Sequence, residues 1–137
     1  MVKITVAYEG NLRTSAIHAG SGAVIKTDAP KDNHGRGELF SPTDLLAVSL
    51  GTCVITIMAI LANKLKVDLS GIRATVDKEM ARTPSRKVGR IVMHIYCPRT
   101  FDLETTSKLE QEGIECPVHH SLHTDVQQEV IFHWGEA

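Results

Sequence analysis

The most constraining feature of the chain is an uncharged apolar run from Leu45 to Ala62, LLAVSLGTCVITIMAILA, which is 18 residues long. A run of this length reaches the lower limit for a membrane-spanning helix. Ser49, Gly51, Thr52 and Thr56 interrupt it, and no other segment of the chain resembles a membrane span. A helix that is apolar all round can equally form the centre of a soluble core. We therefore expect a buried central helix and no association with membranes.

A clear helix start precedes this run, in the order Ser41-Pro42-Thr43-Asp44. Serine is a preferred N-cap residue and proline suits the first helical position. An aspartate three residues after the cap can reach back to it and favours the positive end of the helix. The sequence therefore predicts a central helix over 41–66.

Strands are predicted on both sides of this helix, where apolar and polar residues alternate. The expected elements of a single domain over 1–137 are an N-terminal β-meander (1–27), a loop (28–40), the central helix (41–66), a β-hairpin (71–97), two helices (102–123) and a last strand (127–134). Strands and helices are segregated along the chain, which predicts an α+β fold with largely antiparallel sheets. One small sheet covers only one face of the apolar helix, so we expect a second subunit to cover another.

Charge and composition exclude several classes of function. The chain has 15 basic and 16 acidic residues, so its net charge is −1, and 4% of its residues are aromatic. It lacks both the basic field and the stacking surfaces on which nucleic-acid binding depends, so we expect no nucleic-acid partner. The N-terminal MVKITVAYEG alternates and does not resemble a secretory signal. We expect a cytoplasmic protein, in which three cysteines do not form a disulfide framework.

Cys116 stands directly before Pro117, which places it at the N-cap of a short helix. Cysteine is an uncommon cap. The free backbone N–H groups of a helix N-terminus stabilise a thiolate and lower the pKa of a cysteine. The sequence therefore predicts a reactive thiol at Cys116.

The other two cysteines have less distinctive surroundings. Cys53 lies in the middle of the central helix, where a buried cysteine usually acts as a small hydrophobic residue with a raised pKa. Gly51 and Ser49 thin the helix surface nearby, which would allow another element or a substrate to approach closely. Cys97 alternates with apolar residues at the end of a strand, and we interpret it as part of the core.

Histidines cluster beside Cys116 in the sequence CPVHHSLH. Cys116, His119 or His120, and His123 would share one face of a helix, and Cys/His sets bind zinc. A Cys–His pair for nucleophilic hydrolysis is a further alternative. Both alternatives lack a completing partner, since there is no CxxC motif and no obvious fourth ligand. We therefore expect no metal and no bound cofactor.

Two motifs in combination identify a family. The string SPTDLLAVSLGTCVITIMAILANK, the preceding loop TDAPKDNHGRGEL and the distant CPVHHSLH closely resemble the OsmC/Ohr family, the osmotically inducible and organic-hydroperoxide-resistance proteins. The resemblance implies an intertwined homodimer with active sites at its interface. It also implies that Cys53 attacks a small organic hydroperoxide, that Cys116 resolves the product to a disulfide, and that an external dithiol reduces that disulfide.

The chain departs from the hydroperoxide-resistance pattern at one position and leaves another open. Those members carry a glutamate ten residues before the attacking cysteine, where this chain has Thr43. Asp44 and Glu38 are the candidates to replace that glutamate. Their partner arginine lies in an N-terminal turn, where Arg13 is the nearest match and Arg36 is the alternative. The missing glutamate also leaves open a protein without peroxidase activity, which would bind a small apolar ligand at the dimer interface.

Overall fold

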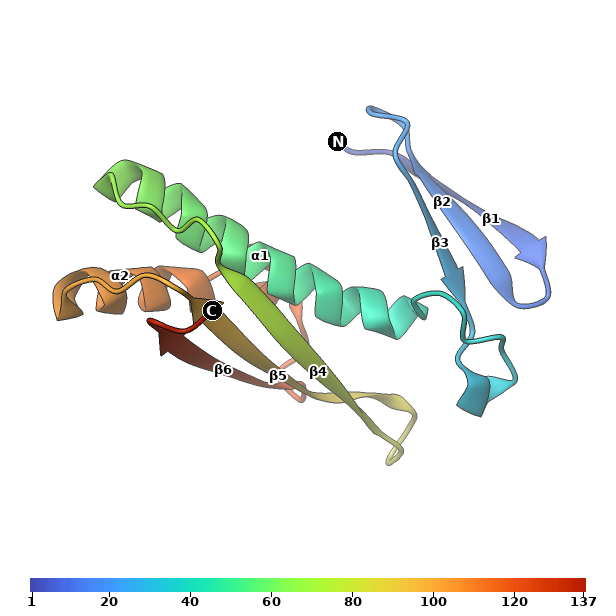
Figure 1. The fold of residues 1–137 in the computed structure, drawn as a ribbon. Helices are drawn as coiled ribbons and strands as arrows, with labels where there is room; N and C mark the ends of the chain where they lie inside the picture. Colours follow the sequence, from blue (N-terminus) through green and yellow to red (C-terminus); the bar gives the residue numbers. More distant parts are fainter. The chain divides into compact units, whose positions relative to one another are not determined.

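The computed structural model describes residues 1–137, which group into two compact units, Met1–Leu46 and Ala47–Ala137 (Figure 1). Each unit is described by itself. The single domain that the sequence predicts over 1–137 stays a prediction.

The N-terminal unit is built on a three-stranded antiparallel meander. Its elements are β1 (Ile4–Gly10), β2 (Arg13–His18), β3 (Val24–Asp28) and the 3-10 turn η1 (Lys31–Asn33). The strand order is β1-β2-β3, as expected for strands joined by short turns. The meander that the alternating pattern predicts over 1–27 thus ends one residue later, at Asp28.

The turn between β1 and β2 holds two residues in the left-handed region, Asn11 at φ 53° and Leu12 at φ 62°. Asparagine tolerates this conformation, but for a bulky residue such as leucine it is strained. Two hydrogen bonds hold the Leu12 backbone: its N–H donates to the Tyr8 hydroxyl (3.2 Å), and its carbonyl accepts from the Ala29 N–H (3.0 Å). This tightly fixed turn leads directly into Arg13.

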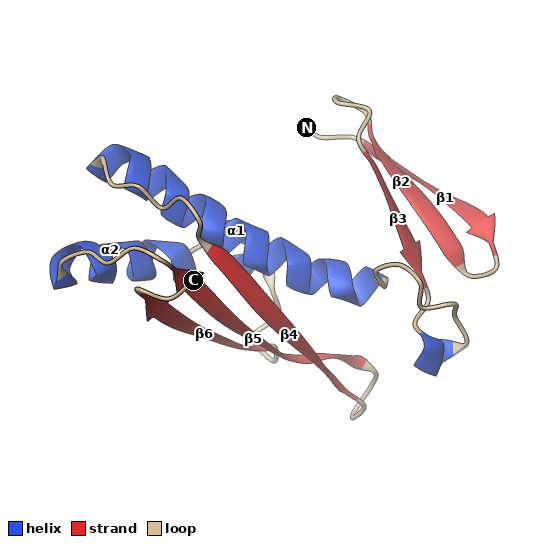
Figure 2. Ribbon diagram, viewed as in Figure 1, coloured by secondary structure: helices blue, strands red, loops and turns tan.

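The larger unit packs helices against a second three-stranded sheet (Figure 2). Its elements are α1 (Pro42–Leu65), which begins in the N-terminal unit, β4 (Arg73–Ala81), β5 (Lys87–Cys97), α2 (Leu103–Ile114), α3 (Pro117–Ser121) and β6 (Gln127–Trp134). The sheet order is β4-β5-β6. The predicted α+β class is confirmed.

One strand runs in an unexpected direction. β4 and β5 form an antiparallel hairpin, but β6 pairs with β5 in parallel. The expectation of largely antiparallel sheets therefore holds for every pairing except this one. Parallel neighbours need a crossover connection, which α2 and α3 supply between β5 and β6.

The start of α1 has the predicted capping box. The Ser41 Oγ accepts a hydrogen bond from the Asp44 N–H (3.1 Å), and the Asp44 carboxylate accepts one from the Ser41 N–H (2.8 Å). This reciprocal pair satisfies two backbone donors at the helix end. It fixes where the long helix begins.

The core of the larger unit lies between α1, α2 and the inner face of the sheet. α1 buries one face, made of Ala47, Leu50, Gly51, Val54, Met58 and Ala62. β5 contributes Ile91, Met93, Ile95 and Cys97, each at most 1% exposed. Cys97 is therefore part of the core, as predicted.

Two glycines permit close helix packing. A Cβ at Gly51 would lie 2.9 Å from Val76 Cγ2 of β4, so the thinned helix surface predicted there receives a strand. A Cβ at Gly113 would lie 2.7 Å from Met58 Cγ of α1. Gly113 lies one residue before the end of α2 at Ile114.

Apolar side chains remain exposed on both units. In β1, Ile4, Val6 and Tyr8 are 59%, 65% and 68% exposed. On α1, Val48 and Ile60 are 38% and 47% exposed. By length and composition alone α1 would also pass as a membrane span. Its opposite face packs against the sheet, where a Cβ at Gly51 would lie 2.9 Å from Val76 of β4.

Candidate functional site

The structure brings Cys53 and Cys116 together within the larger unit. Cys53 projects from the middle of α1 and is half-buried, whereas Cys116 precedes α3 and is fully buried. The two thiols are close enough that Cys53 raises the pKa of Cys116, and neither is in a disulfide. Two residues 63 positions apart in the sequence thus form one site.

The backbone at the start of α3 holds Cys116 in place. Cys116 has the extended conformation of an N-cap residue, with φ −76° and ψ 153°, and Pro117 occupies the first turn. Its Sγ accepts a hydrogen bond from the His119 N–H (3.3 Å), and its carbonyl accepts one from the His120 N–H (3.2 Å). The predicted capping role of Cys116 is therefore observed.

The predicted direction of its pKa shift is wrong. Burial raises the pKa of the Cys116 thiol, and the neighbouring Cys53 raises it further. Backbone hydrogen bonds from His119 and Val118 lower the pKa, but they do not outweigh burial. A helix N-terminus favours a thiolate, but here the sulfur is enclosed by protein and loses the solvation that an anion needs. At neutral pH, Cys116 is accordingly held as a thiol.

The N-terminal unit gathers a second group of predicted residues around Arg13. Arg13 binds Asp28 in a bidentate manner, with Nε–Oδ1 and Nη2–Oδ2 distances of 2.7 and 2.8 Å. Its Nη2 also donates to Glu38 Oε2 at 3.0 Å. The guanidinium is thus fixed by two carboxylates. Of the two residues proposed to replace the missing glutamate, Glu38 is the one that reaches the arginine.

Asp28 is a functional candidate that the sequence reasoning missed. Its side chain is fully enclosed, and it also accepts a hydrogen bond from the Glu38 N–H (3.3 Å). The Arg13 guanidinium is the main cause that lowers the pKa of this carboxyl. The hydrogen bond to Asp28 in turn raises the pKa of Arg13. Arg13 and Asp28 face each other in the β2–β3 ladder, so an exact strand register would have revealed the pair.

The remaining candidates of this unit have other partners. Asp44 holds the Ser41 N–H in the capping box, and the Thr43 hydroxyl contacts that of Ser41 at 3.2 Å. Arg36, the alternative arginine, lines a cavity of about 430 Å³ together with Asn11 and Leu12 of the β1–β2 turn. Of the two candidate arginines, Arg13 is the one that binds carboxylates, those of Asp28 and Glu38.

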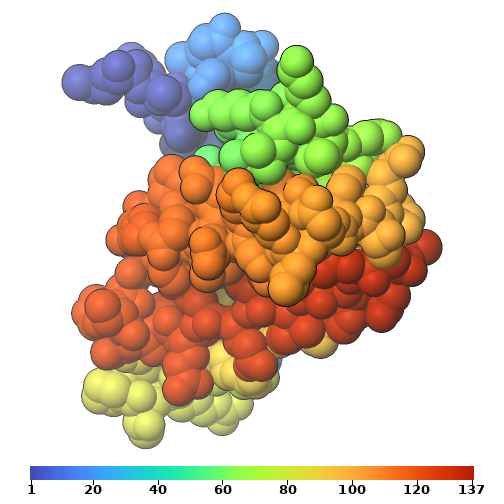
Figure 3. All heavy atoms as spheres, turned by 90° about the vertical axis from the view of Figure 1, so that its left-hand side faces the viewer, coloured from blue at the N-terminus to red at the C-terminus, as the bar shows by residue number.

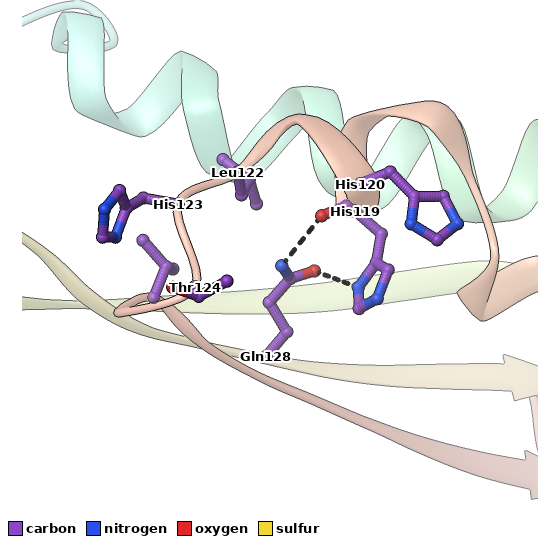
Figure 4. A pocket seen from close by; sticks show the side chains of 7 residues that line it. His119, His120, Leu122, His123, Thr124 and Gln128 are labelled. Carbon is purple, nitrogen blue, oxygen red and sulfur yellow. Dashed lines mark hydrogen bonds between the residues drawn. The ribbon is translucent and has the colours of Figure 1, made fainter.

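The histidines near Cys116 diverge instead of converging. The His119 Nδ1 bonds to Gln128 Oε1 (2.7 Å), and the Gln128 amide donates to the His119 carbonyl (3.3 Å) (Figure 4). His120 contacts Glu115, and His123 contacts Asp125. No group of three His, Cys, Asp or Glu side chains in the chain is placed to hold a metal ion. The zinc alternative therefore lacks a ligand set.

An apolar cavity of about 350 Å³ lies between α1, α2 and β6. Its walls include Leu50, Val54, Ile114, Val130 and Phe132, and His119 and Gln128 line it as polar residues. α2 and β6 lie side by side on the molecular face that Figure 3 shows in orange and red. The cavity belongs to the same unit as the two thiols.

A model of the OsmC-like protein family matches residues 35–130, which include α1 and both site cysteines. This chain belongs to the OsmC-like family. A search of the curated proteins found no match. The solved structure of an osmotic stress induced and detoxification response protein from Psychrobacter arcticus is 45% identical, with a TM-score of 0.92. That match covers 97% of this OsmC-like chain and 96% of the other.

More distant members have the same fold. An organic hydroperoxide resistance protein, OsmC, from Legionella pneumophila is 16% identical, with a TM-score of 0.78 over 97% of this chain and 96% of that chain. An organic hydroperoxide resistance protein from Elizabethkingia anophelis is 12% identical, with a TM-score of 0.78 over 98% and 96% of the two chains. At such identities the likeness establishes the fold.

Proposed function

We propose that this OsmC-like protein reduces organic hydroperoxides with its two thiols and serves in defence against oxidative stress. Family membership supports a role in redox or peroxide stress, since solved members include organic hydroperoxide resistance proteins. The observation that carries the proposal is the proximity of the two thiols, since Cys53 is close enough to raise the pKa of Cys116. A disulfide requires two sulfurs that can meet without rearrangement of the backbone.

The proposed reaction has two steps within the protein. The Cys53 thiolate attacks the outer oxygen of the hydroperoxide, the O–O bond breaks, and the alcohol leaves with a proton, so that Cys53 becomes a sulfenic acid. Cys116 then loses its proton and attacks the Cys53 sulfur as a thiolate. The disulfide forms, and the hydroxyl of the sulfenic acid leaves with a proton as water. An external dithiol reduces this disulfide and is itself oxidised, so no bound cofactor is needed.

The different burial of the two sulfurs supports this division of roles. Cys53 is half-buried, so a peroxide can reach it, whereas Cys116 is enclosed. The raised pKa of Cys116 keeps its proton in place until a sulfenic acid forms beside it. Pure reasoning from the helix N-terminus would choose Cys116 as the attacking residue, and its burial argues against that choice.

Arg13 is the cation that we assign to the attacking thiolate and the peroxide. Its hydrogen bonds to Asp28 and Glu38 use Nε and Nη2, and none uses Nη1. A guanidinium held in this way can present its remaining donors to an anion without first losing conformational freedom. In the proposed enzyme, assembly of the homodimer brings Arg13 to a Cys53 thiol.

The proposed homodimer is supported by the exposed apolar surface. Ile4, Val6 and Tyr8 alternate along β1 and share one face of the first sheet. Contiguous apolar patches of this kind are rare on monomeric soluble proteins. On α1, Val48 and Ile60 are exposed apolar side chains as well.

Thiol counting after exposure to cumene hydroperoxide tests the reaction. Reduced protein is treated with one equivalent of peroxide, and mass spectrometry of unreduced peptides locates any disulfide. We expect a Cys53–Cys116 disulfide, with faster oxidation by cumene hydroperoxide than by hydrogen peroxide, because apolar side chains surround α1. Cys116→Ser should stop at a sulfenic acid on Cys53.

Cys97→Ala serves as the matched control, because it removes the third thiol without touching the site. It should form the same disulfide at the same rate as the parent protein. Survival of both Cys53 and Cys116 as free thiols in excess peroxide contradicts the proposed reaction.

The second candidate function is the binding of a small apolar ligand without peroxide chemistry. The cavity of about 350 Å³ between α1, α2 and β6 favours it, as does Thr43 at the usual glutamate position. A fluorescent apolar probe tests this function: Cys53→Ser should leave probe binding unchanged, whereas Val130→Trp should fill the cavity and abolish binding. Equal probe binding by the parent and Val130→Trp proteins would exclude this cavity as the site.

A further inference from the structure

Two histidines form a close pair on the outer face of the second sheet, outside the thiol site. His94 lies in β5 and His133 in β6, and in the parallel register His94 aligns with Ile131 while Tyr96 aligns with His133. The two histidines are therefore diagonal neighbours on one face. Their ring nitrogens, His94 Nδ1 and His133 Nε2, are 2.9 Å apart. The reaction proposed above uses neither residue.

A carboxylate lies near the second ring. Glu136 Oε2 lies 3.6 Å from His133 Nδ1. In the tautomer with its proton on Nδ1, on the side of Glu136, His133 turns the lone pair of Nε2 to His94. A histidine whose far nitrogen faces a carboxylate is the usual arrangement around a protein-bound metal.

Stacking holds the rings in place. The Tyr96 ring stacks on His133 at a centroid distance of 4.5 Å and an interplanar angle of 10°. The His94 and His133 rings lie at 5.2 Å and 18°. The Arg73 guanidinium lies over the Tyr96 ring, 4.2 Å from its centroid, and so is directed at the tyrosine. The His133 side chain is 25% exposed, so solutes can reach it.

We propose that His94 and His133 form a bidentate site for a divalent transition-metal ion of the Ni²⁺ or Cu²⁺ class. Metal–imidazole bonds are about 2.0–2.1 Å long, so two nitrogens at right angles on one ion lie about 2.9 Å apart. His94 Nδ1 and His133 Nε2, which share a hydrogen bond, are already 2.9 Å apart. Tetragonal nitrogen and oxygen coordination with right angles is typical of Cu²⁺ and Ni²⁺.

Binding replaces the shared hydrogen bond with two metal bonds. The proton on His94 Nδ1 moves to Nε2, which faces away from His133, and the ring turns to direct its Nδ1 lone pair at the ion. His133 binds through Nε2 and keeps its Nδ1 proton toward Glu136. Water occupies the other coordination positions, because only two protein ligands are present.

Calorimetric titration with NiCl₂ tests the site. The parent for the titration is the Cys53→Ser/Cys116→Ser protein, in which the site thiols do not compete for metal. We expect one Ni²⁺ per chain, an unfolding temperature that rises with Ni²⁺ concentration, since the ion binds the native state, and no response to Mg²⁺, which prefers oxygen ligands. His94→Gln and His133→Gln should each weaken binding at least tenfold.

His18→Gln is the matched control. His18 is also a strand histidine, but it bonds to Ser21 and is distant in sequence from His94 and His133. It should bind Ni²⁺ as the parent does. Circular dichroism of each variant shows that it is folded, and the two single variants provide independent tests. Unchanged affinity in folded His94→Gln or His133→Gln protein, an equal loss in His18→Gln, or no saturable binding at all would overturn the proposal.

Discussion

Asp28 combines full burial with a formal charge, and both its carboxylate oxygens bind the Arg13 guanidinium. A buried carboxylate is tolerated when its hydrogen bonds are satisfied. The pair also determines where the guanidinium points. At the level of single residues, Asp28 therefore acts as a positioning residue for Arg13, and Glu38 adds one exposed contact.

Replacing Asp28 with Asn should lower the peroxidase kcat/KM about 10- to 100-fold, because a misplaced reactive group costs rate of this order. Glu38→Gln is the comparison, and its smaller effect should stay within about threefold because the pair is exposed. Stopped-flow measurements with cumene hydroperoxide separate the two. Equal losses in both variants would show that Asp28 has no special role.

Acid should weaken the N-terminal unit through the same carboxylate. The pKa of Asp28 is lowered by Arg13 from the ordinary value of 3.8. A lowered folded-state pKa contributes stability that is complete above pH 3.8 and is lost as the pH falls through the folded-state pKa. Urea unfolding between pH 2 and 6 should show this loss below about pH 4, and Asp28→Asn should remove that part of the pH dependence.

The raised pKa of Cys116 leads to a prediction about how the rate of the second chemical step depends on pH. Its pKa lies above the ordinary value of 9.0, so the thiolate fraction still increases at that pH. Disulfide formation from the Cys53 sulfenic acid should therefore accelerate with rising pH and show no plateau by pH 9. Rapid-quench measurement of the sulfenic acid after a peroxide pulse checks this. A rate that reaches its plateau near pH 7 would mean that the N-terminus of α3 stabilises the Cys116 thiolate and would contradict this prediction.

Among the secondary structure elements, the helices depend on glycine for their close approach. Gly113 of α2 lies against Met58 and Val54 of α1, both fully buried. Gly51 of α1 lies against Val76 of β4. These contacts set the distances between the layers that carry Cys53 and Cys116.

Gly113→Ala should destabilise the fold by about 1–2 kcal/mol, because the overpacking cost exceeds the gain in helix propensity. The added Cβ would lie 2.7 Å from Met58 Cγ, inside a packed core. Glu112→Ala, at an exposed neighbouring position of α2, should change stability by less than about 0.5 kcal/mol. Denaturant unfolding compares the two. Increased stability of Gly113→Ala would contradict the packing described.

The sequence predicts these elements well because hydrophobic periodicity and capping are local properties. The Ser41–Asp44 box and the strand alternation of 90–97 are examples. Alternation indicates which face of a strand is buried but not the direction of its neighbour, so the parallel β5–β6 pair could not be foreseen. The Arg13–Asp28 pair and the raised Cys116 pKa also depend on residues distant in sequence.

For the whole molecule, the exposed apolar surface leads to a prediction about assembly. Val6→Lys places a charge on the apolar face of β1 and should convert the proposed dimer to a monomer, because burial of an unpaired charge is strongly unfavourable. Thr5→Lys, on the opposite face of the same strand, should leave the dimer intact. Light scattering after size-exclusion chromatography measures both masses. A monomeric parent protein would contradict the proposed assembly.

The half-open position of Cys53 beside the enclosed Cys116 has a consequence for survival under heavy oxidant load. A second peroxide molecule and the Cys116 sulfur compete for the same sulfenic acid, and the Cys116 sulfur lies nearby in the same protein. Irreversible hyperoxidation should therefore be slow in the intact protein. The enclosed cysteine thus acts as a built-in protection for its neighbour, in addition to its part in turnover.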